Sequence, residues 1–314
     1  PITELARAYR QIFNQKARWQ MMGYGNEFGD VEFRKAIVQM LNHQRGMQVN
    51  EQNICITRGS QMGMYLIAQC LFAKGDYVMI ENPGYKPAWK AFEHAGAKLL
   101  PVSVDRDGLL IEDVITYLKS GKKIKAIYVT PHHQYPTTVT LSLKRRLELI
   151  KLSNKYGFTI MEDDYDNEFH FGYRPVLPLS SFTELKNYVY IGTMSKVVAP
   201  ALRIGYLASN NSDLIEQVGS LRKIIDVTHL NFGTGFSKVS TDEHRSLRHL
   251  PNNRTRRSQD AFQTRCQIWS GGARPSFQVP TAVHLHGLRS NDFARWSARH
   301  RYLSQCSSRD ALSP

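Results

Sequence analysis

The spacing of apolar residues changes along this chain, and the changes predict its elements. From residue 31 onward Phe33, Ile37, Met40 and Leu41 recur at three-and-four spacing, which predicts a helix with one buried stripe. Helical patterns return at 143–156 and 211–225. Between them lie short apolar runs without alternation, at 77–81, 99–104, 124–130, 158–162, 188–192 and 203–208. Such runs are typical of strands buried on both faces, so we expect an α/β fold of three layers (αβα) with a mainly parallel sheet.

Polar residues follow several of these runs directly. The segment PHHQYPTT follows 124–130, DDYDNEF follows 158–162 and TMSK follows 188–192. In open α/β sheets, ligands bind beyond the carboxyl ends of the strands. The sequence therefore predicts a site along one edge of the sheet.

Composition limits the class of protein. The 314 residues contain no apolar run near 18 residues and no N-terminal signal pattern, so we expect a cytoplasmic protein without a membrane segment. The four cysteines lack CxxC spacing, and we expect neither a disulfide framework nor a metal site. The net charge of +14 is concentrated in the last quarter, so it is weak evidence for nucleic-acid binding by the rest.

Six motifs carry a family resemblance, covering roughly residues 20–228. The chain resembles the fold-type-I aminotransferases that use pyridoxal 5′-phosphate (PLP), and most closely the aminotransferase-like domain of the MocR/GabR-type (GntR family) transcription regulators. The motifs are YGNEFG (24–29), RGMQVNEQNICITRGSQ (45–61), KGDYVMIENPGY (74–85), TPHHQYPT (130–137), EDDYDNEF (162–169) and IGTMSKVVAPALRIGY (191–206).

The resemblance assigns residues to the reactive end of the cofactor. A PLP protein needs a lysine that holds the aldehyde as an imine and a carboxylate beside the pyridine nitrogen. By resemblance Lys196 is that lysine and the catalytic residue, since Ser195 before it and Arg203 after it reproduce the pattern TxSK(x)6R. Asp163 is the partner of the pyridine nitrogen, and Tyr165 donates to the ring hydroxyl. Asp164, Asp166 and Glu168 fit a solvated loop and receive no role.

The same resemblance assigns residues to the cofactor phosphate. Thr193, Ser195 and Arg203 would grip it, although Arg203 could merely begin a strand. Gly59, Ser60 and Gln61 open a predicted helix whose free N–H groups suit an anion; taken alone they would be an ordinary helix cap.

Two tyrosines complete the site that the resemblance implies. Tyr85 would stack on the ring, the alternative being a packed loop tyrosine. Tyr24 resembles a tyrosine that reaches the phosphate of the other subunit, so we expect a homodimer with shared sites.

The chain departs from the family at one loop. Many aminotransferases carry an Asn-Pro-Thr-Gly segment whose asparagine bonds the ring hydroxyl, whereas here the stretch is Tyr135-Pro136-Thr137-Thr138. His133 and Gln134 would take over that role. Because threonine tolerates a positive φ poorly, we expect an altered turn at Thr138.

Residues 229–314 form an Arg/Ser-rich segment where the family has its small domain. They contain one lysine and twelve arginines, and no helical or strand period persists. A disordered basic tail and a frameshift are both open, and we favour the frameshift: Phe232 to Phe236 can be encoded as TTT GGA ACA GGC TTT, which read one nucleotide later begins Leu-Glu-Gln-Ala. No substrate-carboxylate arginine is assigned. We therefore expect a PLP-binding large domain over 1–228, with an incomplete N-terminal part, and an aberrant or missing small domain.

Three functions compete on this basis. We prefer an effector-sensing domain of a MocR/GabR-type regulator, which forms an imine on Lys196 and exchanges it with an amino acid or amine. A genuine aminotransferase, moving an amino group between an amino acid and a 2-oxo acid, comes second. A basic nucleic-acid-binding protein acting through 229–314 comes third. The start at Pro1 suggests a fragment, and DNA binding would need a helix-turn-helix domain absent from 1–314.

Overall fold

The computed structural model describes residues 25–168, 176–196 and 200–226, with four isolated positions near the N-terminus. Tyr24 and the whole of 229–314 lie outside the described residues. The expectations placed on them, including the boundary at residue 228, stay predictions.

The described helices agree closely with the spacing of apolar residues. Helix α3 begins where the Asp30 side chain accepts a hydrogen bond from Phe33 N (2.8 Å) and ends at Gly46, whose φ is 64°. The helices are α3 (Val31–Arg45), α4 (Ser60–Leu71), α5 (Lys86–His94), α6 (Ile111–Lys119), α7 (Leu143–Tyr156) and α8 (Ser212–Ile225), with 3-10 turns at η1 (Glu51–Asn53), η2 (Leu179–Ser181) and η3 (Pro200–Leu202).

The strands in the described part of the chain form one eight-stranded sheet in the order β1-β8-β7-β6-β5-β2-β3-β4. Their bounds are β1 (Ile54–Thr57), β2 (Tyr77–Asn82), β3 (Lys98–Asp105), β4 (Gly108–Leu109), β5 (Ile124–Val129), β6 (Thr159–Asp164), β7 (Tyr188–Thr193) and β8 (Gly205–Ala208). The central strands β7, β6, β5, β2 and β3 are all parallel. The expected mainly parallel sheet is confirmed.

One strand departs from the parallel majority, and one strand expectation needs correction. Strand β8 runs antiparallel to both β7 and β1, because only residues 194–204 separate it from β7, fewer than a parallel crossover needs. Strand β3, expected to be buried on both faces, alternates instead: Leu100 and Val102 are buried while Pro101 and Ser103 are exposed. It lies next to the sheet edge, where only the two-residue β4 follows it.

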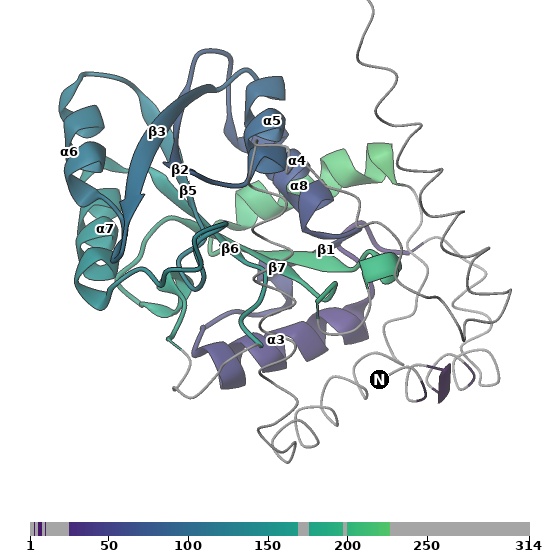
Figure 1. The fold of residues 1–314 in the computed structure, drawn as a ribbon. Helices are drawn as coiled ribbons and strands as arrows, with labels where there is room; N and C mark the ends of the chain where they lie inside the picture. Colours follow the sequence, from purple (N-terminus) through teal and green to yellow (C-terminus); the bar gives the residue numbers. More distant parts are fainter. Residues whose placement is uncertain are drawn as a thin grey trace, which may run out of the picture. The chain divides into compact units, whose positions relative to one another are not determined.

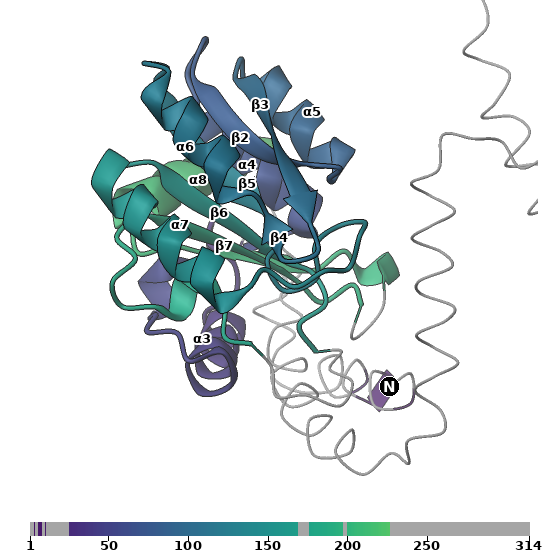
Figure 2. The ribbon, with the colours of Figure 1, turned by 60° about the vertical axis from the view of Figure 1, so that its left-hand side comes forward.

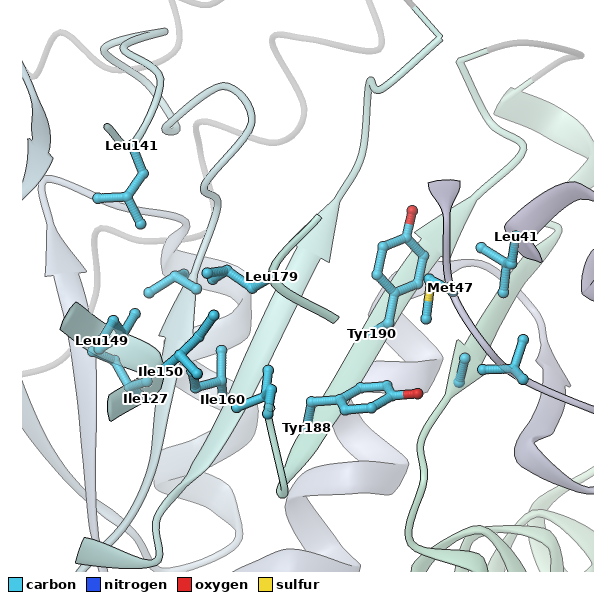
Figure 3. Close-up of a cluster of buried hydrophobic side chains, with 14 of the residues drawn as sticks. Leu41, Met47, Ile127, Leu141, Leu149, Ile150, Ile160, Leu179, Tyr188 and Tyr190 are labelled. Atoms are coloured by element: carbon cyan, nitrogen blue, oxygen red, sulfur yellow. The ribbon is translucent and has the colours of Figure 1, made fainter. Parts of the chain in front are cut away.

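Two apolar clusters cover the two faces of the sheet (Figures 1 and 2). One joins the sheet to α3, α6 and α7, and the other joins it to α4, α5 and α8. Figure 3 shows part of the first cluster, with Tyr188 and Tyr190 on β7 and Met47 beyond α3. Because side chains alternate along a strand, successive residues of β6 face different clusters: Ile160 the α3 side, Met161 the α4 side.

None of the helices in the described ranges is long and apolar enough to cross a membrane.

Candidate cofactor site

One edge of the sheet gathers the polar segments, as predicted. Strands β2, β5, β6 and β7 are parallel neighbours, so their carboxyl ends share an edge. Strand β1 is related to β7 by two antiparallel pairings through β8 and therefore points the same way. Thus the turns after β1, β2, β5, β6 and β7 all emerge at this edge, which is where ligands bind in open α/β sheets.

The helix start after β1 forms an anion cradle with Arg203. Gly59, the N-cap of α4, has φ 83°, and a Cβ placed on it would lie 2.6 Å from Nη2 of Arg203. A Cβ on Gly205 would lie 2.6 Å from the backbone N of Ser60. Only glycine at both positions lets the guanidinium and strand β8 approach the helix N-terminus this closely. The free N–H groups and the guanidinium together suit a phosphate.

The turn after β7 supplies hydroxyls beside this cradle. Thr193 Oγ1 accepts from Ser195 N (3.1 Å) and donates to the carbonyl of Ile204 (3.3 Å), which ties the turn to the start of β8. Lys196 follows in the same turn and is exposed. Gln61 donates to the carbonyl of Pro87 (2.9 Å), and its buried Oε1 has no hydrogen-bond partner among the described residues.

Asp163 is buried at the end of β6 with one oxygen engaged. Tyr128 on β5 donates to Asp163 Oδ2 at 2.6 Å, whereas the buried Oδ1 finds no partner within the described part of the chain. Burial, which the bond from Tyr128 opposes and the nearby Asp166 carboxylate reinforces, raises the pKa of Asp163 to about 7. An unsatisfied buried carboxylate oxygen is costly unless a donor reaches it, and a protonated pyridine nitrogen is such a donor.

Aromatic side chains surround this position. The rings of Tyr85 and Tyr135 meet edge-on with centroids 5.5 Å apart, and Tyr135 meets Tyr165 at 6.4 Å. Burial raises the pKa of Tyr85, Asp163 and Tyr135 raise it too, and Arg203 lowers it. Tyr85 therefore lies within electrostatic reach of both Asp163 and Arg203. Tyr165 donates to the carbonyl of His133 at 2.9 Å.

The loop after β5 is held by Gln134. Its Nε2 donates to the carbonyls of Pro83 (2.7 Å) and Tyr135 (2.6 Å), and its Oε1 accepts from Thr137 Oγ1 (2.6 Å). The Gln134 amide is thus engaged within the protein and holds the shape of the turn. Thr138 has φ 64°, so the turn keeps the left-handed geometry that a glycine would favour.

His133 pairs with Asp166. The Nδ1 of His133 lies 2.8 Å from Asp166 Oδ2. Partial burial lowers the pKa of His133, but the Asp166 carboxylate more than offsets this, and the net shift is upward. This contact joins the loop after β5 to the segment after β6.

The acidic residues after Asp163 do not form a solvated loop, and that expectation was wrong. Asp164 and Asp166 are buried, and the Glu168 side chain is only 9% exposed. Arg45 contacts Glu168 at 2.7 Å and Asp164 at 3.8 Å, and Tyr190 donates to Asp164 at 2.5 Å. Arg45, at the basic end of α3, thus accounts for the burial of Asp164 and Glu168.

Sequence reasoning missed two further buried polar groups. Tyr128 and Glu81 lie inside runs taken as core strands. Glu81 accepts from Thr130 N (3.0 Å) and Thr130 Oγ1 (2.6 Å), and burial raises its pKa to about 7. For Glu81, the available signal was a carboxylate at the end of an otherwise apolar run.

Fold and site together define a fold-type-I PLP-dependent protein: the residues fit PLP at the pyridine nitrogen, through Asp163, and at the phosphate, through Gly59, Ser60 and Arg203. A family model described as aminotransferase class I and II matches residues 1–230, and the chain belongs to this family. Its cofactor is PLP.

Relatives include both enzymes and regulators. The chain is 30% identical over 213 residues to aromatic-amino-acid aminotransferase 1 of Thermococcus litoralis, covering 67% of this chain and 51% of that protein. It is 31% identical over 202 residues to the probable rhizopine catabolism regulatory protein MocR of Rhizobium meliloti, covering 63% and 40%. The chain thus spans about half, or less, of the length of these relatives.

Solved structures agree on the fold. Kynurenine aminotransferase of Pyrococcus horikoshii, in complex with PMP, superposes with a TM-score of 0.70 at 28% identity, covering 76% of this chain and 59% of that one.

Proposed function

We propose that this chain is the effector-sensing part of a MocR/GabR-type transcription regulator, in which Lys196 holds PLP covalently until an amino acid or amine displaces it. The loop after β5 carries the proposal. Tyr135 stands where the resemblance places the asparagine that bonds the ring hydroxyl in many aminotransferases, and it packs edge-on against Tyr85. Gln134 beside it is engaged within the protein. Loss of that tuning group favours exchange over turnover, and the similarity to MocR supports the same reading.

The remaining residues have roles in holding the cofactor. PLP, when bound, supplies an electron sink through its protonated ring. Asp163 Oδ1 accepts from the ring nitrogen, and Tyr85 covers one face of the ring. Gly59, Ser60, Gln61, Thr193, Ser195 and Arg203 bind the phosphate. His133 and Tyr165 bound the ring-hydroxyl side, where Tyr165 is tied to the His133 carbonyl.

We further propose that the active unit is a homodimer in which Tyr24 of one subunit reaches the phosphate bound by its partner. Size-exclusion chromatography with light scattering, with and without PLP, tests this, and a monomer at all concentrations would contradict it.

The decisive experiment traps the bond between PLP and its lysine by reduction. The purified chain is mixed with PLP, its visible absorbance recorded, and the complex reduced with borohydride and mapped by peptide mass. We expect the label on Lys196, its loss in Lys196→Ala and its persistence in Lys186→Ala, an exposed lysine just before β7. A label elsewhere would overturn the assignment of Lys196.

A genuine aminotransferase is the second candidate, supported by the similarity to the Thermococcus litoralis enzyme. Steady turnover of an amino acid with 2-oxoglutarate would favour this enzyme. Displacement of the Lys196 bond by an amino compound without 2-oxo acid turnover would favour the sensor.

A further inference from the structure

We propose that Tyr128 is a positioning residue for the cofactor: its hydroxyl engages Asp163 Oδ2 and thereby turns Oδ1 toward the pyridine nitrogen. This inference rests on the proposed binding of PLP beside Asp163.

The geometry of two neighbouring strands supports the inference. Strands β5 and β6 are parallel, with Tyr128 paired to Met161, and Asp163 lies two residues beyond Met161 on the same face of β6. The hydroxyl therefore reaches the carboxylate, at 2.6 Å. The tyrosine ring is itself fixed, because Phe92 of α5 packs edge-on against it with centroids 5.5 Å apart and it is 1% exposed.

Among the described residues, the hydrogen bond from Tyr128 opposes the effect of burial on Asp163. The titratable groups that raise the pKa of Asp163, or whose own pKa its charge raises, include Glu81 on β2, Tyr85 before α5 and Asp166 after β6. All three carry negative charge when they ionise. Burial, which the hydrogen bond from Tyr128 opposes and Asp166 reinforces, raises the pKa of Asp163 to about 7.

Loss of the hydroxyl has two consequences. Asp163 Oδ2 becomes a second unsatisfied buried oxygen, and the carboxyl stays protonated to higher pH, because a hydrogen bond to a charged group is worth about one pKa unit or more. A protonated Asp163 holds the ring N–H less strongly, because a charge-assisted hydrogen bond becomes a neutral one. Cofactor binding should therefore weaken near neutral pH and recover as the pH rises.

A neighbouring pair provides the matched control. Tyr190 donates to Asp164 at 2.5 Å, so Tyr190→Phe removes the same kind of buried bond from the adjacent carboxylate, on the opposite face of the sheet. We would titrate wild type, Tyr128→Phe and Tyr190→Phe with PLP between pH 6 and 9. We expect Tyr128→Phe to bind PLP about tenfold more weakly at pH 7, with the acid limb displaced upward by about one pH unit. Tyr190→Phe should keep the wild-type profile.

A second measurement separates this inference from the proposed function. In the PLP-free chain, carbon NMR of labelled aspartates, with Asp163→Asn for assignment, should show a higher Asp163 pKa in Tyr128→Phe than in wild type. An unchanged pKa, or an equal shift of the binding profile in Tyr190→Phe, would overturn the role of Tyr128 whatever happens at Lys196. Failure of the label to appear on Lys196 would overturn the proposed function while leaving the NMR comparison intact.

Discussion

Nη2 of Arg45, at the last residue of α3, lies 2.7 Å from Oε1 of Glu168 in the loop beyond β6. The same guanidinium lies 3.8 Å from Asp164, and all three side chains are largely buried. This cluster ties the loop that follows Asp163 to a helix far away in the sequence.

The Arg45 cluster predicts a large cost of truncation. Arg45→Met leaves the buried Glu168 carboxylate without its cation, and breaking a buried pair from one side costs about 3–5 kcal/mol. We expect the free energy of unfolding, from urea titration at pH 7, to fall by that order. Lys35→Met, which removes an exposed pair with Glu32, should change it by less than about 1 kcal/mol. Equal effects of the two changes would contradict the buried cluster.

Buried acids predict the pH dependence of stability. Burial raises the pKa of Asp163 to about 7, of Asp164 to about 8 and of Glu81 to about 7. The folded chain therefore binds more protons than the unfolded chain between about pH 4 and pH 8. The stability that these acids contribute at a pH below their pKa in the unfolded chain is lost as the pH rises through their pKa in the folded chain. The PLP-free chain should therefore be more stable at pH 5 than at pH 8.

Urea titrations of the PLP-free chain at several pH values measure this slope. Asp164→Asn removes one of the responsible groups and should flatten it. A free energy of unfolding that rises from pH 5 to pH 8 would show that these carboxyls are ionised in the folded chain.

The turn at Thr138 predicts a stabilising substitution. A left-handed residue with a Cβ costs roughly 1–2 kcal/mol, and the extra freedom of glycine in the unfolded chain takes back about half of that. Thr138→Gly should raise the free energy of unfolding by about 0.5–1 kcal/mol. Thr138→Ala keeps the Cβ and the strain, so no comparable gain is expected. If the free energy of unfolding rose equally in both variants, the cause would be the loss of the threonine hydroxyl and methyl groups and not the relief of backbone strain.

The anion cradle formed by the start of α4 and Arg203 predicts that a substitution at Gly59 lowers the affinity for PLP. In Gly59→Ala the new Cβ would lie 2.6 Å from Arg203 Nη2, so the guanidinium must move. We expect PLP affinity to fall at least about tenfold, corresponding to roughly one lost charge-assisted bond, while affinity for pyridoxal, which lacks the phosphate, changes little.

Gly75 controls for backbone strain in this test. It also has a positive φ, 94°, but a Cβ there meets nothing within 4 Å. Gly75→Ala should therefore cost stability without altering the affinity for PLP. Similar PLP affinities in the two alanine variants would argue against the cradle.

The sequence was most informative where pattern and chemistry coincide at strand ends. The runs before TMSK and DDYDNEF became β7 and β6, and Ser195 and Asp163 lie beyond or at their ends, as expected. Tyr128 was missed because a tyrosine in the run IKAIYVT is indistinguishable from a core aromatic until the neighbouring strand is known. The burial of Glu168 depends on Arg45, 123 residues away, and no local pattern reports such a pair.

Asp163 and Asp164 face opposite sides of β6, and each is bonded by its own tyrosine, one from β5 and one from β7. If β6 slid by one residue against its neighbours, every side chain would exchange faces, and each tyrosine would lose the acid opposite it. The two tyrosines, one on each neighbouring strand, thus hold β6 in its register. They fix which of two identical, adjacent side chains takes the place proposed for the partner of the pyridine nitrogen.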